Sequence, residues 1–89
     1  MALQILNAGP DPSEVANDLR GRIEAAIEEA SVHVEAAGPG HYEIRVVSPA
    51  FAGLSRVRQQ QLVYAAIAEL MSGREAPVHA IDKMECVTP

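Results

Sequence analysis

The chain has 89 residues and a formal net charge of −5, from 12 acidic and 7 basic side chains, and 48% of its residues are hydrophobic. A chain of this length forms at most one domain with little room for a deep enzyme pocket, and its acidic balance argues against tight non-specific binding to nucleic acid. The single cysteine excludes an internal disulfide, and the sequence shows neither a membrane-spanning apolar run nor a signal peptide, so we expect a soluble cytoplasmic protein.

The first predicted element is a helix that begins after a short lead-in of residues 1–10. Asp11 can accept hydrogen bonds from the free N–H groups of the first helical turn, and Pro12 suits the first helical position. Apolar residues then recur every four positions, which is typical of a helix with one buried stripe: Val15, Leu19, Ile23 and Ile27. We therefore place the domain at residues 11–89, starting with this helix.

Two strands joined by a tight turn follow the helix. Apolar and polar side chains alternate over residues 31–36 and again over residues 41–48. The Gly-Pro-Gly sequence at residues 38–40 is a turn signal. The second strand should end at Pro49, because proline cannot donate to a sheet. The pattern predicts a β-hairpin whose second strand buries one face, made of Tyr42, Ile44 and Val46.

A second helix and a third strand complete the predicted domain. Ser55 suits the N-cap of a helix over residues 56–71, and Pro77 precedes a last strand from residue 78 to about residue 87. A right-handed crossover through the long helix sets the third strand parallel to the second. The expected fold class is α+β, a two-layer sandwich with a three-stranded mixed sheet and helices on one face. The apolar face of the second helix is assigned to Leu62, Ile67, Leu70 and Met71, with Val63 and Ala66 beside them.

Four segments resemble, in order, the BolA family. They are HYEIRVVS at residues 41–48, FAGLSRV at 51–57, QLVYAA at 61–66, and a closing segment that begins Val78-His79-Ala80 and ends Thr88-Pro89. The match extends over roughly residues 14–89. This resemblance implies a KH-like class II (BolA-like) fold of order α-β-β-(α)-α-β, in which a short extra helical turn falls within residues 50–55.

The resemblance also implies a partner and a metal cluster. BolA-like proteins act with monothiol glutaredoxins of the CGFS type, in a heterodimer with a bridging 2Fe-2S cluster, to which glutathione also contributes. The family's histidine ligand, in the closing His-Ala pair, matches His79. The second ligand, a His or Cys between the first two strands, is best matched by His41. The isolated chain is expected to bind no cluster and to be a monomer or a weak homodimer.

The sequence departs from the family pattern at three places. The loop of residues 36–40 is short and contains no Cys or His, so His41 is the second ligand if the chain provides one. The stretch from His79 to Thr88 looks about one residue longer than usual, which predicts a β-bulge. The helix reads Arg-Gln-Gln-Gln at residues 58–61, where many members are more basic, and this difference weakens a nucleic-acid role.

The residues themselves limit the metal chemistry. A 2Fe-2S cluster needs four ligands, usually Cys thiolates and sometimes His on one iron. The chain has one Cys and three His, so any cluster bound here must be shared with another molecule. The pattern alone favours His79 as a strand histidine that is hydrogen-bonded at the sheet edge, and it leaves His41 open as a surface residue of the hairpin. Cys86 is expected to be a buried or half-buried structural thiol, and a reactive or cluster-binding role stays open.

Arg56 and Arg58 occupy the first turn of the second predicted helix, where the helix dipole disfavours positive charge. This position suggests a compensating contact with glutathione or the glutaredoxin surface, or with nucleic-acid phosphate. A solvated surface role stays open for both side chains.

The leading hypothesis is a non-enzymatic accessory protein of iron–sulfur cluster assembly, trafficking or iron sensing, acting with a glutaredoxin. The alternative is a DNA-binding transcriptional regulator of the BolA type that acts in stress response through weak DNA binding. The net charge and the single lysine, Lys83, count against that alternative. A third hypothesis is an interaction module without metal. The sequence contains no nucleophile–base pattern or phosphate loop, so we expect no enzyme activity.

Overall fold

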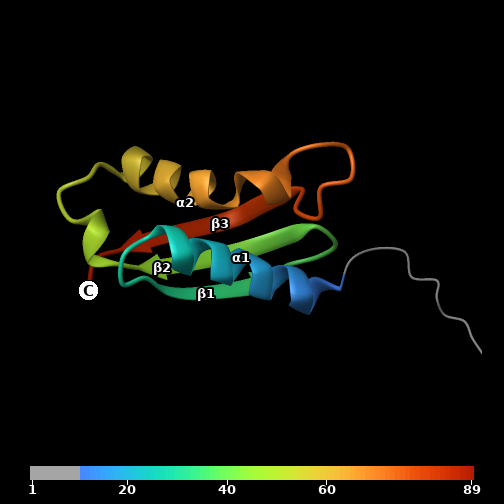
Figure 1. The fold of residues 1–89 in the computed structure, drawn as a ribbon, viewed down its shortest axis with the longest axis horizontal. Helices are drawn as coiled ribbons and strands as arrows, with labels where there is room; N and C mark the ends of the chain where they lie inside the picture. Colours follow the sequence, from blue (N-terminus) through green and yellow to red (C-terminus); the bar gives the residue numbers. More distant parts are fainter. Residues whose placement is uncertain (1–10) are drawn as a thin grey trace, which may run out of the picture.

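The computed structural model describes residues 11–89 (Figure 1), and the predicted lead-in of residues 1–10 lies outside the described residues. Within residues 11–89 the elements are α1 (Pro12–Ala26), β1 (Ser31–Ala36), β2 (His41–Val47), the short 3₁₀ helix η2 (Pro49–Phe51), α2 (Arg56–Met71) and β3 (Ala80–Val87). This order confirms the predicted α+β arrangement, including the short helical turn before the long helix. No helix in this range is long and apolar enough to cross a membrane.

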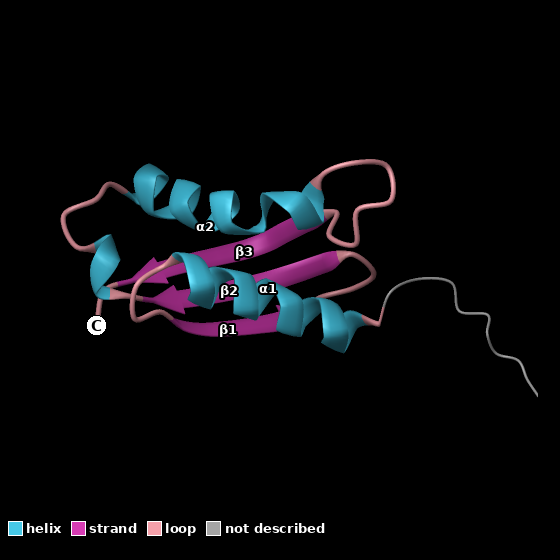
Figure 2. Ribbon diagram, viewed as in Figure 1, coloured by secondary structure: helices cyan, strands magenta, loops and turns pink. Residues whose placement is uncertain are grey.

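The three strands form one mixed sheet in the order β1-β2-β3. β1 and β2 are antiparallel, whereas β2 and β3 are parallel, as the predicted crossover through α2 requires. Both helices lie on one face of the sheet, α1 beside β1 and β2 and α2 beside β3 (Figure 2). The parallel pairing places the first residue of β2, His41, opposite the first residue of β3, Ala80. The two predicted ligand positions therefore meet at one end of the sheet.

The helix starts confirm the predicted caps. The carboxylate of Asp11 accepts a hydrogen bond from the backbone N–H of Ser13 at 2.9 Å, and this bond lowers the pKa of Asp11. The hydroxyl of Ser55 accepts a hydrogen bond from the backbone N–H of Arg58 at 3.2 Å. Both caps satisfy N–H groups that the first helical turn leaves without a partner.

The hydrophobic core lies between the helices and the sheet. The predicted stripe of α1 and the predicted inner face of β2 are both buried. Phe51, the one phenylalanine of the chain, is 0% exposed and enters the core from η2. The residues of the core are Val15, Leu19, Ile23, Ile27, Tyr42, Ile44, Val46, Phe51, Val63, Ile67, Leu70 and Val78.

The predicted β-bulge is present in β3. Tyr42 pairs with Ile81, but the next residue of β2, Glu43, pairs with Lys83. Asp82 is therefore the extra residue, without a partner of its own on β2. A bulge bends its strand and changes the direction of a side chain. This one lies two residues inside β3, close to His41.

Two predicted details are wrong. Leu62, which was assigned to the apolar face of α2, is 41% exposed, whereas Val63, which was expected beside that face, is 0% exposed. The rest of the predicted face is confirmed, because Ile67 and Leu70 belong to the core and Met71 packs against it. The last strand begins at Ala80 rather than at Val78, because the N–H of Val78 donates to the carbonyl of Leu70 at the end of α2. His79 thus lies just before β3.

Candidate functional site

His79 lies in an exposed position at the end of the sheet, immediately before β3. Its backbone N–H donates to the carbonyl of Gly40 at 2.8 Å, and the N–H of Ala80 donates to the same carbonyl at 3.2 Å. The residue before it, Val78, is 1% exposed and anchors this segment in the core. The backbone of His79 is therefore fixed between a buried residue and the turn of the hairpin, while its side chain stays accessible.

The imidazole of His79 lies directly against the backbone of Gly40. A β-carbon on Gly40 would lie 2.7 Å from Nδ1 and 2.8 Å from Cγ of His79, which is closer than any van der Waals contact allows. Gly40 also has a φ of +76°, in the left-handed region that favours glycine. The hairpin turn therefore serves a second purpose beyond reversing the chain: it provides the surface on which the ring of His79 lies.

His41 is the first residue of β2, and its side chain is 45% exposed. Its Nδ1 lies 2.9 Å from Oδ1 of Asp82, the bulge residue of β3, whose side chain is 41% exposed. His41 alternates with the buried Tyr42, so it belongs to the open face of the sheet. One ring nitrogen of His41 is engaged by the protein, and the other is available.

The structure brings His41 and His79 to neighbouring positions, since Ala80 is the partner of His41 in the sheet. Their side chains nevertheless have different surroundings, because His79 packs on Gly40 and His41 contacts Asp82. Residues 11–89 contain no group of three or more His, Cys, Asp or Glu side chains arranged to hold a metal ion. The described part of the chain thus offers two histidines at one end of the sheet rather than a complete metal site.

A mostly apolar hollow of about 470 Å³ lies beside His79. It is formed by the start of α1, the turn between β1 and β2, and the segment before β3. Burial, together with the negative charge of Asp11, raises the pKa of the Tyr42 hydroxyl at its base, so this group stays protonated. The residues around the hollow are Pro12, Ala36, Gly38, Pro39, Gly40, Tyr42, Pro77 and His79.

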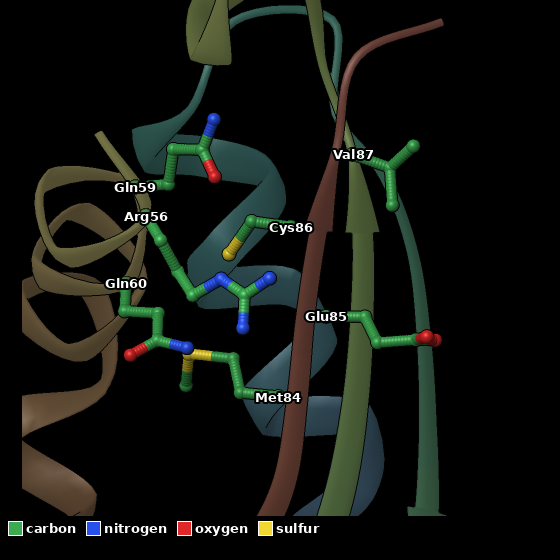
Figure 3. A pocket seen from close by; sticks show the side chains of 7 residues that line it. All are labelled: Arg56, Gln59, Gln60, Met84, Glu85, Cys86 and Val87. Atoms are coloured by element: carbon green, nitrogen blue, oxygen red, sulfur yellow. The ribbon is translucent and has the colours of Figure 1, made fainter. Parts of the chain in front are cut away.

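Cys86 lies far from the two histidines, at the other end of β3. It is six positions beyond Ala80 along the strand, which corresponds to about 20 Å. It is half-buried, and desolvation raises the pKa of its thiol, so the neutral form is favoured. Figure 3 shows its sulfur pointing into a hollow of about 260 Å³ between α2 and β3. These properties agree with the predicted structural thiol. The position of Cys86 also keeps its thiol away from His79.

Arg56 and Arg58 are exposed in the first turn of α2. Arg56 extends across the hollow toward β3, next to Cys86 and Gln60, whereas the side chains of Glu85 and Val87 point away (Figure 3). This hollow lies at the opposite end of the sheet from His79, so the two arginines are not brought together with the histidines. A contact of either arginine with glutathione, with the partner protein or with nucleic acid stays a prediction.

The family of the chain follows from a comparison with known proteins. The family model described as BolA-like protein matches residues 19–89, which include the hairpin, α2, β3 and both histidines of the site. The chain belongs to the BolA-like family. This membership and the observed fold agree with the resemblance of the sequence segments. A search of curated protein sequences gives no match to this BolA-like chain.

Solved structures have the same fold as this BolA-like protein. BolA1 from Arabidopsis thaliana is 24% identical, with a TM-score of 0.69 over 83% of this chain and 90% of that one. A bolA protein homologue from Coxiella burnetii is 30% identical, with a TM-score of 0.67 over 82% of this chain and 88% of that one. The BolA domain of SufE1 from Arabidopsis thaliana is 29% identical, with a TM-score of 0.68 over 84% and 92% of the two chains.

Two residues of the site were not predicted from the sequence of this BolA-like protein. Gly40 was assigned only to a turn, and its contact with His79 depends on the pairing of distant segments. Asp82 was not assigned to the site at all. The extra length before Thr88 indicated a bulge, but it did not indicate which residue the bulge would turn toward His41.

Proposed function

We propose that this BolA-like protein is a non-enzymatic accessory protein of iron–sulfur cluster assembly, trafficking or iron sensing. It forms a heterodimer with a CGFS monothiol glutaredoxin. His79, with His41 as the second ligand, donates imidazole nitrogen to a 2Fe-2S cluster that both proteins and glutathione share. Family membership supports the choice of partner, and the geometry around His79 supports its assignment as a ligand.

The observation that carries the proposal is the accessibility of the His79 imidazole. The ring is exposed, and within residues 11–89 none of the side-chain hydrogen bonds involves it. Its backbone is held at the same time by the carbonyl of Gly40 and by the buried Val78. A histidine sealed in the core, with both nitrogens bonded to the protein, would be unable to bind metal. A histidine that binds a cluster shared with another protein needs a fixed backbone and an accessible ring.

The donor set of the chain fits a shared cluster. Imidazole can replace thiolate on one iron of a 2Fe-2S cluster, and this replacement raises the reduction potential. The one thiol of the chain, Cys86, is half-buried at the far end of β3 and cannot join His79. The thiolates must therefore come from the glutaredoxin and glutathione. A cluster that is divided between two proteins suits transfer or sensing better than permanent storage.

Reconstitution with a glutaredoxin tests the proposal. The chain is mixed anaerobically with a CGFS glutaredoxin, glutathione, ferrous iron and sulfide, and visible absorption and circular dichroism are recorded. We expect a heterodimer on size exclusion and a spectrum distinct from that of the glutaredoxin homodimer. The variant His79→Ala should change this spectrum while the far-UV spectrum stays the same, because the side chain is exposed.

The matched control is His33→Ala, which removes an imidazole that is 71% exposed and contacts only Glu35, at 3.4 Å. His33 lies on the open face of β1, so its removal should leave the cluster spectrum unchanged. Absence of a heterodimer and of any spectral change with the unmodified chain would reject the proposed function. An unchanged spectrum for His79→Ala would reject His79 as a ligand.

A further inference from the structure

We propose that Asp82, the extra residue of the β3 bulge, is a positioning residue for His41 and leaves Nε2 of His41 as the atom that binds metal. This inference rests on the proposed function and specifies the second ligand of that site. It assigns a purpose to the one place where the pairing of β2 with β3 is irregular.

The position of the bulge supports this assignment. Between Tyr42 and Glu43 of β2, the partner strand contains one residue more than regular pairing needs, and that residue is Asp82. Bulges redirect a side chain, and here the redirected carboxylate lies 2.9 Å from Nδ1 of His41. In a regular strand, Ile81 would be followed at once by the partner of Glu43. The chain would then have no additional carboxylate beside His41.

The chemistry of the contact defines the free nitrogen. An ionised carboxylate only accepts hydrogen bonds, so Nδ1 of His41 must carry the hydrogen and donate it to Asp82. In a neutral imidazole the lone pair then lies on Nε2. Histidines that bind metals usually donate their other ring N–H to a carboxylate or carbonyl, which fixes the tautomer and the ring orientation. His41 already has this arrangement on the protein side.

A purely structural role explains the contact less well. The side chains of His41 and Asp82 are 45% and 41% exposed, and ion pairs with such exposure contribute little to folding stability. The same face contains another exposed pair, Arg45 with Glu85 at 3.4 Å, which has no histidine and lies farther along β3. Removal of Glu85 therefore provides a control with the same loss of charge on the same strand.

The first experiment uses the protein without metal. Long-range ¹H–¹⁵N correlation spectra of the imidazoles are recorded at pH 8 for the unmodified chain, Asp82→Ala and Glu85→Ala. We expect His41 of the unmodified chain to be mainly the tautomer with hydrogen on Nδ1. Asp82→Ala should shift His41 toward the Nε2–H tautomer, and Glu85→Ala should leave it unchanged. The same tautomer populations in all three proteins would overturn the proposal.

The second experiment measures the lifetime of the cluster in the glutaredoxin heterodimer. Loss of a residue that orients a metal ligand typically weakens metal binding about 10–100-fold, so Asp82→Ala should release the cluster at least about 10-fold faster. Asp82→Asn keeps an oxygen acceptor and should recover part of this loss. Equal lifetimes for Asp82→Ala and Glu85→Ala would overturn the inference and leave the proposed function intact. A His41→Ala variant with an unchanged spectrum would overturn the inference and remove His41 as a ligand, while the heterodimer and the role of His79 would stand. An unmodified chain that forms no cluster with the glutaredoxin would reject both.

Discussion

Substitution of Gly40 by alanine tests how the protein holds His79. The added β-carbon would lie 2.7 Å from Nδ1 and 2.8 Å from Cγ of His79, so the ring and this carbon cannot keep their positions together. The ring is an exposed side chain and can rotate away, whereas the Gly40 backbone is fixed by its bonds to His79 and Ala80. We therefore expect a folded protein in which the imidazole of His79 is displaced.

The loss of stability can be estimated from the backbone angle. Gly40 has a φ of +76°, and a left-handed conformation costs an L-residue about 1–2 kcal/mol. For a domain of this size, each kcal/mol lowers the Tm by roughly 4–8 °C. Gly53 offers a matched control, because its φ is +79° and a β-carbon there meets no atom within 4 Å. Gly53→Ala should therefore lose a similar amount of stability without moving His79.

The assay combines thermal unfolding with the cluster spectrum. Gly40→Ala and Gly53→Ala should show comparable decreases in Tm, but only Gly40→Ala should change the imidazole resonances of His79 and alter the spectrum of the glutaredoxin complex. If both variants gave the unmodified cluster spectrum, the contact between Gly40 and His79 would have no part in metal binding. If Gly53→Ala changed the spectrum as strongly as Gly40→Ala, the effect would be one of stability alone.

Three further predictions concern the core, the thiol and nucleic acid. Phe51→Ala should lower the free energy of unfolding in urea by about 3–5 kcal/mol, because this ring is 0% exposed, and a loss below about 1 kcal/mol would contradict its place in the core. Because burial raises the pKa of Cys86, its alkylation should begin at higher pH in the folded than in the unfolded chain. For the same reason, the free energy of unfolding should fall as pH rises past the ordinary thiol pKa. Identical alkylation profiles for the folded and unfolded chains would refute this prediction. We expect no duplex DNA binding in an anisotropy titration at physiological salt, given the net charge of −5, and salt-sensitive binding there would favour the regulator hypothesis.

The order and type of the elements could be predicted because local signals and simple topology rules agree. The cap at Asp11, the stripe of α1 and the alternation of β2 each define one element, and the crossover rule then determines the direction of β3. The predicted face of α2 was wrong at one residue, because Leu62 and Val63 are adjacent and both apolar. The pattern alone does not decide which of two neighbouring apolar residues faces the sheet, and packing against the sheet decides it.

The site was predicted only in part, for a related reason. His79 and His41 came from the family pattern, and their proximity at one end of the sheet follows from parallel pairing. The contacts of Gly40 with His79 and of Asp82 with His41 join residues about 40 positions apart in the chain. They depend on strand register and on the side to which the bulge turns, and no local sequence signal specifies either.

The most direct test of the account is whether a nitrogen of this chain is bound to iron. The chain is labelled with ¹⁵N-histidine, the glutaredoxin and glutathione stay unlabelled, and pulsed EPR is recorded on the reduced heterodimer. We predict a ¹⁵N hyperfine coupling of the size expected for directly bound imidazole, which the variant His79→Ala loses. A cluster without any ¹⁵N coupling, or with a coupling that persists unchanged in His79→Ala, would contradict the assignment of His79 as a ligand.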